Sequence, residues 1–132
     1  LSSEIKIFKP GNVSYEENIA YIKCCTLCIS PTLMESFGMA LMEALICKVP
    51  CVVFDIEATG EIIKNGKFGY VVPYLDIEEM IEKSFAILTN ANLYSKLKTN
   101  IQYSFKTSST NEEALNEYIS MFKLFEDTIK KP

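Results

Sequence analysis

The sequence predicts an α/β fold in which helices cover both faces of a parallel sheet. Short apolar runs bounded by Pro and Gly alternate along the chain with segments of helical periodicity. Several of the strand-like runs are apolar throughout, which is typical of parallel strands buried on both faces. With 132 residues, 48% of them hydrophobic, the chain is long enough for one such domain.

Hydrophobic periodicity and cap signals divide the chain into a series of strands and helices. In order, we expect a strand at residues 5–8, a helix at 15–23, a strand at 26–30, a helix at 37–47, a strand at 51–54, a short helix at 60–64, a strand at 69–72, a helix from 77, a helix at 93–103 and a last helix at 112–128. Because helices separate the strands, the strands are expected to be parallel.

Turn and cap residues set the boundaries in the first half of the chain. Residues 5–8 alternate like a short strand, which ends before a Pro-Gly pair. Ser14 and Glu17 form a capping box, and the helix that follows is expected to bury Ile19 and Ile22. A proline likewise stops the next strand.

The later helices differ in their apolar patterns. Residues 37–47 are apolar on almost every side of a helix, and a helix of that kind is buried. Asp76 and Glu79 form another capping box, which opens the helix from residue 77. One face of that helix carries the apolar residues Ile77, Met80, Ile81, Phe85 and Leu88. The last helix carries an apolar stripe that we expect to be core rather than a partner or membrane surface, formed by Leu115, Tyr118, Ile119, Phe122 and Phe125.

The composition excludes several classes of site. All 13 basic residues are Lys, and there is no His. Without imidazole there is no Ser-His-Asp triad and no His-ligated zinc, and without Arg there is no bidentate fork for phosphate. The formal net charge of −4 argues against a nucleic-acid partner and against a general anionic-membrane surface.

Two interpretations fit the spacing of four of the five cysteines. Cys25 with Cys28, and Cys47 with Cys51, could form the two halves of a four-cysteine zinc site. Alternatively each is a small buried hydrophobe, because Cys28 and Cys51 fall in strand-like apolar runs. We favour the second interpretation and expect no metal, because the residues inside the first pair are not those of a zinc knuckle. An odd number of cysteines without disulfide spacing suggests a reducing cytosol.

No segment of the sequence has the features of a membrane span or a signal peptide. The longest apolar stretch, at residues 37–47, is much shorter than the ~20 residues that cross a bilayer. The first residues lack an initiator Met as well as the basic and apolar regions of a signal peptide, so the chain looks like a piece of a longer protein. We expect a cytoplasmic location, with any peripheral association at the inner membrane face made only by the rest of the protein.

Two segments are expected to lie where the ligands of parallel sheets bind. Such ligands sit beyond the carboxyl ends of the strands, where the next helix presents free N–H groups. In this chain that rule selects residues 30–39 and 55–61. We therefore expect the chemistry of the protein in these segments.

Glu43 is the carboxylate that fits a core helix least well. It lies inside the apolar run 39–47, so apolar side chains surround it whichever way the helix is turned. Burying an unpaired carboxylate costs several kcal/mol, so a partner is expected. Lys48 or backbone N–H groups of a neighbouring loop could be that partner. We favour the other reading, in which Glu43 faces a cleft and binds ligand hydroxyls.

Glu35 lies just before the same helix, in the loop that follows a strand. Along a helix axis it is on the order of 10 Å from Glu43, which suits two groups that hold opposite ends of one extended ligand. The backbone N–H groups of Ser36, Phe37, Gly38 and Met39 form the start of the helix, which is a natural seat for a phosphate. A first-turn acid that complements the helix dipole is the alternative explanation of Glu35.

Three stretches of the sequence together resemble a known family. They are residues 30–44 (SPTLMESFGMALMEA), 49–53 (VPCVV) and 60–73 (GEIIKNGKFGYVVP). The ordered set resembles the C-terminal, nucleotide-sugar-binding domain of retaining GT-B glycosyltransferases of family 4, also described as glycosyl transferases group 1. The resemblance covers roughly residues 4–90 and implies a Rossmann-like domain over residues 1–110 that is incomplete at its N-terminus.

The resemblance implies a donor site made by particular residues of this chain. Glu35 would lie beside the transferred hexose as the catalytic-site carboxylate, and Glu43 would accept hydrogen bonds from the ribose hydroxyls. The main chain that follows Glu35 would contact the hexose and phosphate, at Ser36, Phe37, Gly38 and Met39. The segment at Val13 would read the base through its backbone. The family needs no metal or other cofactor in this domain, and the donor would be a UDP-, GDP- or ADP-sugar.

The resemblance also implies retaining transfer of a hexose to a glycan, lipid or protein acceptor, as in polysaccharide biosynthesis. The acceptor would bind through an N-terminal domain that these residues lack. Residues 111–132 would form a C-terminal helix that packs toward that domain, and the fragment alone would be inactive. A non-catalytic nucleotide-sugar-binding or interaction module on the same fold is the alternative.

Three positions depart from the family pattern. Ser36 stands where Gly is common, Thr26 where the strand often begins with Asp, and Lys48 where Gly usually ends the helix. Lys48 must therefore tolerate a helix C-terminal position that favours Gly, although its charge suits the dipole there. None of these departures removes a donor-site group.

Overall fold

Parallel strands form the central sheet of the molecule. The structure, a computed structural model, describes residues 6–35, 38–57 and 59–105. Within these residues the strands are β1 (Cys28–Ser30), β2 (Cys51–Phe54) and β3 (Gly69–Val72), in the spatial order β1-β2-β3. Both strand pairs are parallel, so the carboxyl ends of all these strands lie at one edge of the sheet.

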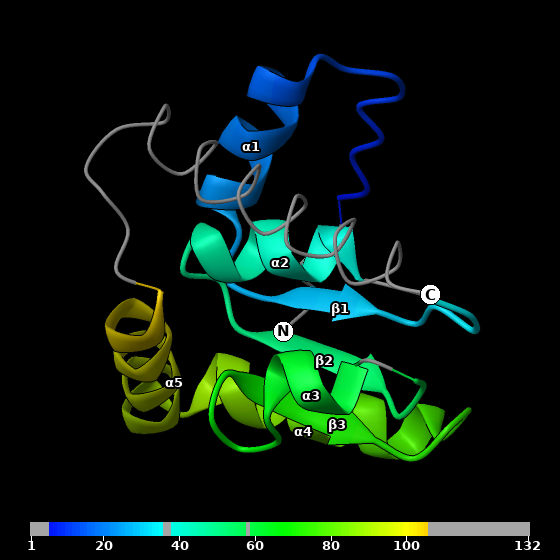
Figure 1. Cartoon of the computed structure of the whole chain (residues 1–132), viewed down its shortest axis with the longest axis vertical. Helices are drawn as coiled ribbons and strands as arrows, with labels where there is room; N and C mark the ends of the chain where they lie inside the picture. The colour runs from blue at the N-terminus through cyan, green and yellow to red at the C-terminus, as the bar shows by residue number, and fades with distance from the viewer. Residues whose placement is uncertain (1–5, 36–37, 58, 106–132) are drawn as a thin grey trace, which may run out of the picture.

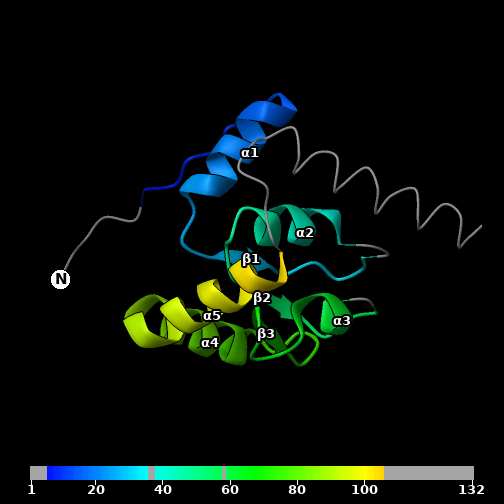
Figure 2. The same cartoon turned by 60° about the vertical axis from the view of Figure 1, so that its left-hand side comes forward.

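Helices cover both faces of the sheet (Figures 1 and 2). They are α1 (Tyr15–Cys24), α2 (Met39–Ile46), α3 (Thr59–Ile63), α4 (Ile77–Thr89) and α5 (Ala91–Ser104). α2 and α3 pack on one face and α4 on the other, while α5 contributes to the core on both sides. α1 packs against α2. This arrangement confirms the expected α/β class.

Strand β2 divides the core into two clusters because its successive side chains point to opposite faces. Cys51 and Val53 pack with Leu45 of α2 on one face. Val52 and Phe54 pack with Ile87 of α4 on the other. All residues of β2 are buried, which explains why this part of the sequence is continuously apolar rather than alternating.

The capping box predicted at Ser14 is confirmed, whereas at Asp76 only the side-chain half of the predicted box forms, because the Asp76 amide donates to the Pro73 carbonyl instead. At α1, the Ser14 hydroxyl accepts a hydrogen bond from the Glu17 amide at 3.2 Å, and the Glu17 carboxylate accepts one from the Ser14 amide at 2.9 Å. At α4, the Asp76 carboxylate accepts from the Glu79 amide at 2.8 Å. The Glu79 carboxylate lies 3.7 Å from the ammonium group of Lys83.

Other element boundaries shift by a few residues from the expected ones. β1 begins at Cys28 rather than at residue 26, and α5 extends over Ala91–Ser104. Lys48 follows α2 with φ of 64°, so the helix does end in the left-handed conformation that favours Gly. The expected helix at 112–128, and with it the proposed unit 111–132, lies outside the described residues.

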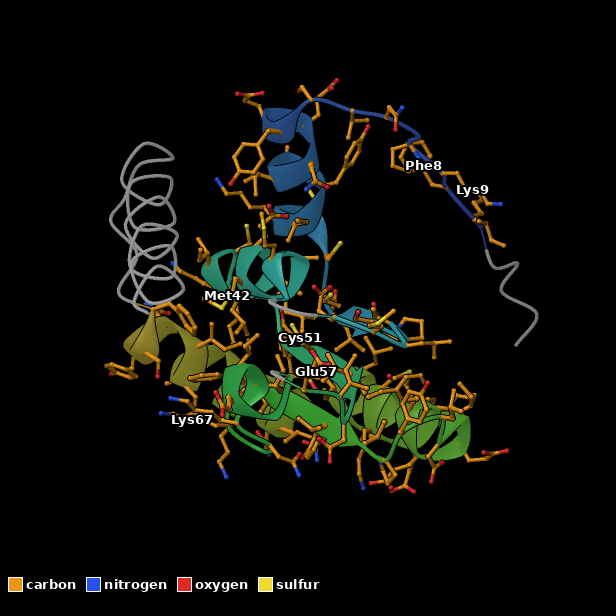
Figure 3. The ribbon with its side chains drawn as sticks, turned by 45° about the vertical axis from the view of Figure 1, so that its right-hand side comes forward. Phe8, Lys9, Met42, Cys51, Glu57 and Lys67 are labelled. Carbon is orange, nitrogen blue, oxygen red and sulfur yellow. The ribbon has the colours of Figure 1, made fainter. Side chains whose placement is uncertain are left out.

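The prediction of a strand at residues 5–8 is wrong for residues 6–8, which form no strand. Ile7 and Phe8 are 79% and 71% exposed, and the rings of Phe8 and Tyr21 of α1 have centroids 5.7 Å apart. Figure 3 shows Phe8 and Lys9 on an extended segment that lies away from the sheet. Alternation gives a strand only where a neighbouring strand supplies hydrogen bonds, and among the described residues no strand pairs with this segment.

The burial predicted for α1 is also wrong. The helix has no buried residue, and the two isoleucines expected in the core, Ile19 and Ile22, are half-buried. Ile22 packs against the core cluster that includes Leu45 of α2. α1 packs on α2 rather than directly on the sheet, so its apolar side chains are only partly covered.

The buried face of α4 differs from the apolar face predicted from its sequence. Met80 is buried as the pattern suggests, together with Ser84 and Ile87. Ile81 and Phe85, near the centre of the apolar stripe, are 64% and 66% exposed. The side of α4 that packs on the sheet is therefore rotated away from the most hydrophobic side of the helix.

Candidate functional site

The loops that follow the strands meet at the carboxyl edge of the sheet and line an open pocket of about 580 Å³. The lining residues are Leu33, Met34 and Glu35 after β1, Ile56 and Glu57 after β2, and Tyr74 after β3. The two segments selected from the sequence, 30–39 and 55–61, therefore come together as expected. Two carboxylates and a phenol stand among apolar walls, a combination able to hydrogen-bond hydroxyl groups.

The loop after β2 is fixed by the side chain of Thr59 at the start of α3. The Thr59 hydroxyl lies 2.8 Å from the carbonyl oxygen of Phe54 and accepts a hydrogen bond from the Ile56 amide at 3.0 Å. Between them Glu57 has a φ of 29°, a conformation that is uncommon for residues other than Gly. Glu57, labelled in Figure 3, lies in this loop and lines the pocket.

The N-terminus of α2 starts at Gly38, whose backbone is left-handed with φ of 70°. The left-handed backbone favours glycine here, and a Cβ atom would in addition lie 2.9 Å from the Cδ1 atom of Ile62 in α3, whose side-chain end would have to shift. Gly38 caps the helix without a side chain, and its carbonyl accepts hydrogen bonds from the amides of Leu41 and Met42. By helix geometry the preceding amides, including that of Met39, have no partner within the helix and could bind an anion.

Glu43 lies on the side of α2 that faces α1, where it is half-buried. Its carboxylate accepts a hydrogen bond from the side-chain amide of Asn18 at 3.3 Å. The partner found in the described residues is thus Asn18 of α1, and not Lys48 or a backbone amide, the two groups considered from the sequence. An amide donor leaves the carboxylate charged and leaves other lone pairs for a ligand.

Burial and hydrogen bonding act on the Glu43 carboxyl group in opposite directions. Partial removal from water raises its pKa above the ordinary value of a glutamate, and this is the larger influence. The hydrogen bond from Asn18 favours the charged form and lowers the pKa, but by less. The charged form of Glu43 is therefore destabilised by partial burial, and ionisable groups perturbed in this way are frequent at binding sites.

Val13 lies directly before Ser14, the N-cap of α1, and is half-buried. Asn18 is little more than one turn further along the same helix. Glu43 contacts Asn18, so α1 brings the segment at Val13 to the same side of the molecule as Glu43. Val13 and Glu43, two of the residues expected in the site, are thus linked through Asn18.

The described residues do not place all the expected groups in one pocket. Glu35 lines the pocket at the carboxyl edge, whereas Glu43 lies between α1 and α2. Gly38 and Met39 at the start of α2 come between these two positions along the chain. Ser36 and Phe37, the other expected contacts, lie outside the described residues.

Three residues of the site were missed from the sequence. Asn18 carries no local signal, because its role depends on how α1 packs on α2. Glu57 and Tyr74 each follow a strand, so the rule that ligands bind at the carboxyl ends could have identified them. Glu57 did fall inside the selected segment 55–61 but was not singled out.

The interpretation of the four cysteines as small buried hydrophobes holds only in part. Cys51 is buried and Cys28 and Cys47 are half-buried, but Cys25 is exposed and so is not a buried hydrophobe. Partial burial raises the pKa of the Cys47 thiol. Within the described residues, no group of three or more Cys, Asp or Glu side chains is arranged to hold a metal ion.

The sequence matches a known family over most of its length. The family described as Glycosyl transferases group 1 matches residues 1–103. Poly(ribitol-phosphate) alpha-N-acetylglucosaminyltransferase from Staphylococcus aureus is 32% identical over 99 residues, which are 71% of this chain and 20% of that protein. N-acetyl-alpha-D-glucosaminyl L-malate synthase from Bacillus anthracis is 25% identical over 88 residues, which are 67% of this chain and 23% of that protein.

Solved structures of glycosyltransferases share the fold. Sucrose-phosphate synthase from Thermosynechococcus elongatus has a TM-score of 0.67 and 21% identity, covering 89% of this chain and 30% of that one. A glycosyltransferase from Rickettsia africae has a TM-score of 0.62 and 22% identity, covering 98% of this chain and 33% of that one. The chain thus spans between a fifth and a third of the length of these proteins. Among the helices of the described residues, none combines the length and hydrophobicity needed to cross a bilayer.

Proposed function

Because the chain belongs to the glycosyl transferases group 1 family, we propose that it forms part of the donor site of a glycosyltransferase. The donor is a nucleotide diphosphate sugar with a uridine, guanosine or adenosine base. The domain is the C-terminal half of a retaining family 4 enzyme of GT-B fold, and the protein transfers a hexose to a glycan, lipid or protein acceptor. The acceptor binds to a part of the enzyme outside these residues, so the 132 residues alone are inactive.

The half-buried carboxylate of Glu43 is the observation that carries this proposal. Burial raises the pKa of this carboxyl group, and its partner found among the described residues is the amide of Asn18 rather than a cation. A carboxylate of this kind can accept hydrogen bonds from two neighbouring hydroxyls, such as those of a ribose. The segment at Val13 is linked to it through α1 and would contact the base with its backbone.

The start of α2 is suited to the diphosphate of the same donor. The amides at Gly38 and Met39 lie at the positive end of the helix dipole, which favours a bound anion. Ser36 and Phe37 belong to the same proposed contact. Negative charge that develops on the leaving diphosphate would be stabilised there by fixed dipoles.

The pocket at the carboxyl edge is suited to the transferred hexose. Glu35 lines it and is the proposed catalytic-site carboxylate, positioned to hydrogen-bond hexose hydroxyls. The names of the two relatives from Staphylococcus and Bacillus specify transfer of an α-linked N-acetylglucosaminyl group. These names support a hexose or N-acetylhexosamine donor and an α-linked product, which agrees with retention when the donor is itself α-linked.

Donor binding to the intact protein tests the proposal. Thermal shift measurements with UDP-, GDP- and ADP-sugars should show stabilisation by one nucleotide class, because a ligand that binds only the folded state raises the melting temperature. The Glu43→Ala variant should lose this response. Glu43→Gln keeps the shape of the side chain and tests the role of its charge. Glu78→Ala, an exposed glutamate of α4, is the matched control and should respond like the wild type.

A transfer assay tests the role of Glu35 separately. Glu35→Gln should reduce kcat by more than it changes the KM for the donor, because the group is proposed to act beside the reacting hexose. If both Glu35→Gln and Glu43→Ala transfer sugar at the wild-type rate, the assignment of the donor site is wrong.

A further inference from the structure

Two cysteines lie side by side at the amino ends of neighbouring strands. Cys28 is the first residue of β1 and Cys51 the first residue of β2, and the register of this parallel pair makes them direct partners. Both side chains pack in the core cluster on the face that α2 covers. Neighbouring strands lie about 4.8 Å apart, within the range of ~4.4–6.8 Å that separates the Cα atoms of disulfide-bonded cysteines. The backbone therefore holds the two residues at a separation that a disulfide can span.

The two thiols contact each other but differ in their surroundings. A hydrogen bond joins their side chains. Cys51, labelled in Figure 3, is fully buried, and its thiol also lies 3.6 Å from the carbonyl oxygen of Val49, which can accept its proton. Cys28 is only half-buried. Cys28 is therefore the member of the pair that a small reagent can reach from solvent.

The hydrogen bond between the thiols makes one of them more acidic than the other. It lowers the pKa of the Cys28 thiol, because the charged sulfur of Cys28 accepts the bond, and this influence is larger than the opposing one of partial burial. The same bond, together with burial, raises the pKa of the Cys51 thiol well above its usual value. The thiolate is the reactive form of cysteine. Cys28 is therefore the nucleophile of the pair, and Cys51 keeps its proton.

We propose that Cys28 and Cys51 form a redox site that reacts with hydrogen peroxide. The Cys28 thiolate attacks one oxygen of the peroxide, the O–O bond breaks, and a sulfenic acid forms on Cys28 with release of hydroxide. The Cys51 sulfur then attacks the Cys28 sulfur. An S–S bond forms, the S–O bond breaks, and the leaving hydroxyl takes the Cys51 proton to give water. The first hydroxide takes up the proton that Cys28 lost, so two thiols become a disulfide and one peroxide becomes two waters.

The other three cysteines lie in different surroundings. Cys24 and Cys25 are exposed at the end of α1, and the Cys25 thiol donates to the Tyr21 carbonyl at 3.3 Å. Cys47 is half-buried, and burial raises the pKa of its thiol, which disfavours the reactive thiolate. Cys25 is near enough to influence the titration of Cys47. A link between Cys25 and Cys47 is therefore the competing product for which an experiment must look.

A disulfide between Cys28 and Cys51 would close a loop around much of the candidate site. The residues between the two cysteines include Glu35, Gly38 and Glu43, whereas the link itself lies at the amino ends of the strands, away from the pocket at the carboxyl edge. Because a cross-link lowers the conformational entropy of the unfolded chain, the oxidised protein should resist thermal unfolding better than the reduced protein. The site thus preserves this segment under oxidising conditions. The redox site itself does not depend on the proposed function.

Mass-spectrometric mapping of the intact protein after treatment with hydrogen peroxide tests the proposal. Free thiols are blocked with N-ethylmaleimide, and chymotrypsin cleavage after Leu27 separates Cys28 from Cys24 and Cys25. A peptide pair linked through Cys28 and Cys51 should appear, and dithiothreitol should abolish it. Cys24→Ala is the matched control, because this thiol is exposed and outside the pair, and it should give the same linked peptides as the wild type.

Two variants and a melting curve test the order of the steps and the effect of the link. Dimedone, which traps sulfenic acids, should label Cys28 in Cys51→Ala but should not label Cys51 in Cys28→Ala. Oxidation should raise the melting temperature of the wild type by on the order of 5 °C or more. Cys28→Ala should show no such increase.

The same measurements include the results that would overturn the proposal. Peroxide that oxidises the exposed Cys24 without linking Cys28 to Cys51 would show that the folded pair is unreactive. A link between Cys25 and Cys47 in its place would assign the reaction to other thiols, and a Cys28–Cys51 link that forms only in denaturant would show that the folded geometry does not favour it. A melting temperature unchanged by the link would overturn the stabilising role.

Discussion

Helices α2 and α4 lie on opposite faces of the sheet, and they differ in how well the apolar pattern of each sequence matches the residues that are buried. α2 has apolar residues on almost every side and no clear stripe, and it is buried at Leu41, Met42, Ala44 and Leu45. α4 has a well-defined apolar stripe, yet Ile81 and Phe85 at its centre are mostly exposed. Thus α4, which has the clearer apolar stripe, buries less of the surface that its sequence predicts to be buried.

The difference shows what a hydrophobic stripe reports. The stripe indicates how much apolar surface of a helix needs to be buried. Which part of that surface is buried depends on the elements that pack against the helix. α2 lies between α1 and the sheet, so it is covered on two sides. α4 lies over β2 and β3, and the exposed part of its stripe, including Ile81 and Phe85, lines a groove beside Ile29.

The largest effect is expected from the buried contacts that fix each helix. Leu45→Ala in α2 and Ile87→Ala in α4 should each lower the free energy of unfolding by about 2–5 kcal/mol, since both side chains are essentially fully buried. Denaturant unfolding measures this. Similar losses at both positions would confirm that Ile87 anchors α4 although it lies off the apparent stripe. A loss at Leu45 alone would mean that α4 is held by its exposed residues instead.

The start of α2 should be the next most sensitive position. Gly38→Ala should destabilise the protein by about 1–3 kcal/mol, because the left-handed backbone disfavours a Cβ and that atom would press on Ile62. Gly66→Ala is the control, since Gly66 has φ of 78° with nothing near its added Cβ. Gly38→Ala should cost more than Gly66→Ala and should also weaken donor binding. Equal losses would show that the contact with Ile62 is unimportant.

A smaller effect, of opposite sign, is expected on the buried side of α4. The hydroxyl of Ser84 is buried without a hydrogen-bond partner among the described residues. Ser84→Ala should therefore raise the free energy of unfolding, by up to about 1 kcal/mol, because an unsatisfied polar group is removed. Ser95→Ala on the exposed side of α5 reports the helix propensity alone and should raise stability less. A loss of stability in Ser84→Ala would mean that the hydroxyl has a partner in the intact protein.

The smallest effect is the pH dependence that Glu43 contributes to stability. Its pKa is raised in the folded state, mainly by burial, so the unfolded state gives up its proton first as the pH rises. This group therefore favours folding at pH below the ordinary glutamate pKa of about 4.3, and that contribution is lost as the pH rises through and just above that value. Glu43→Gln should remove this dependence in unfolding curves measured from pH 4 to pH 7.

Asn18→Ala sharpens the same measurement. Removing the amide donor should raise the pKa of Glu43 further, so the loss of stability should extend to higher pH than in the wild type. An unchanged profile in both Asn18→Ala and Glu43→Gln would contradict the assignment of the pH dependence to this pair.

Local patterns predicted most of the elements but not their partners. The capping box at Ser14, the apolar run at β2 and the loops at the carboxyl edge follow from residue types and spacing, because they depend on interactions within a few residues. The strand predicted at residues 5–8 is absent over the described residues 6–8, because a strand needs a neighbouring strand and a local pattern cannot show whether one is present. The prediction that Cys25 is buried is wrong for a similar reason, because the spacing of cysteines along the chain does not determine which of them are buried.

The sequence by itself determined the alternating order of strands and helices, the segments that meet at the carboxyl edge of the sheet, and that Glu43 would need an explanation as a charge in an apolar helix. Only the tertiary structure decided that Asn18 is the hydrogen-bond partner of Glu43 and that Glu57 and Tyr74 join Glu35 at one pocket. Periodicity and caps are local properties of the chain, whereas contacts between residues far apart in sequence depend on how complete elements pack against one another.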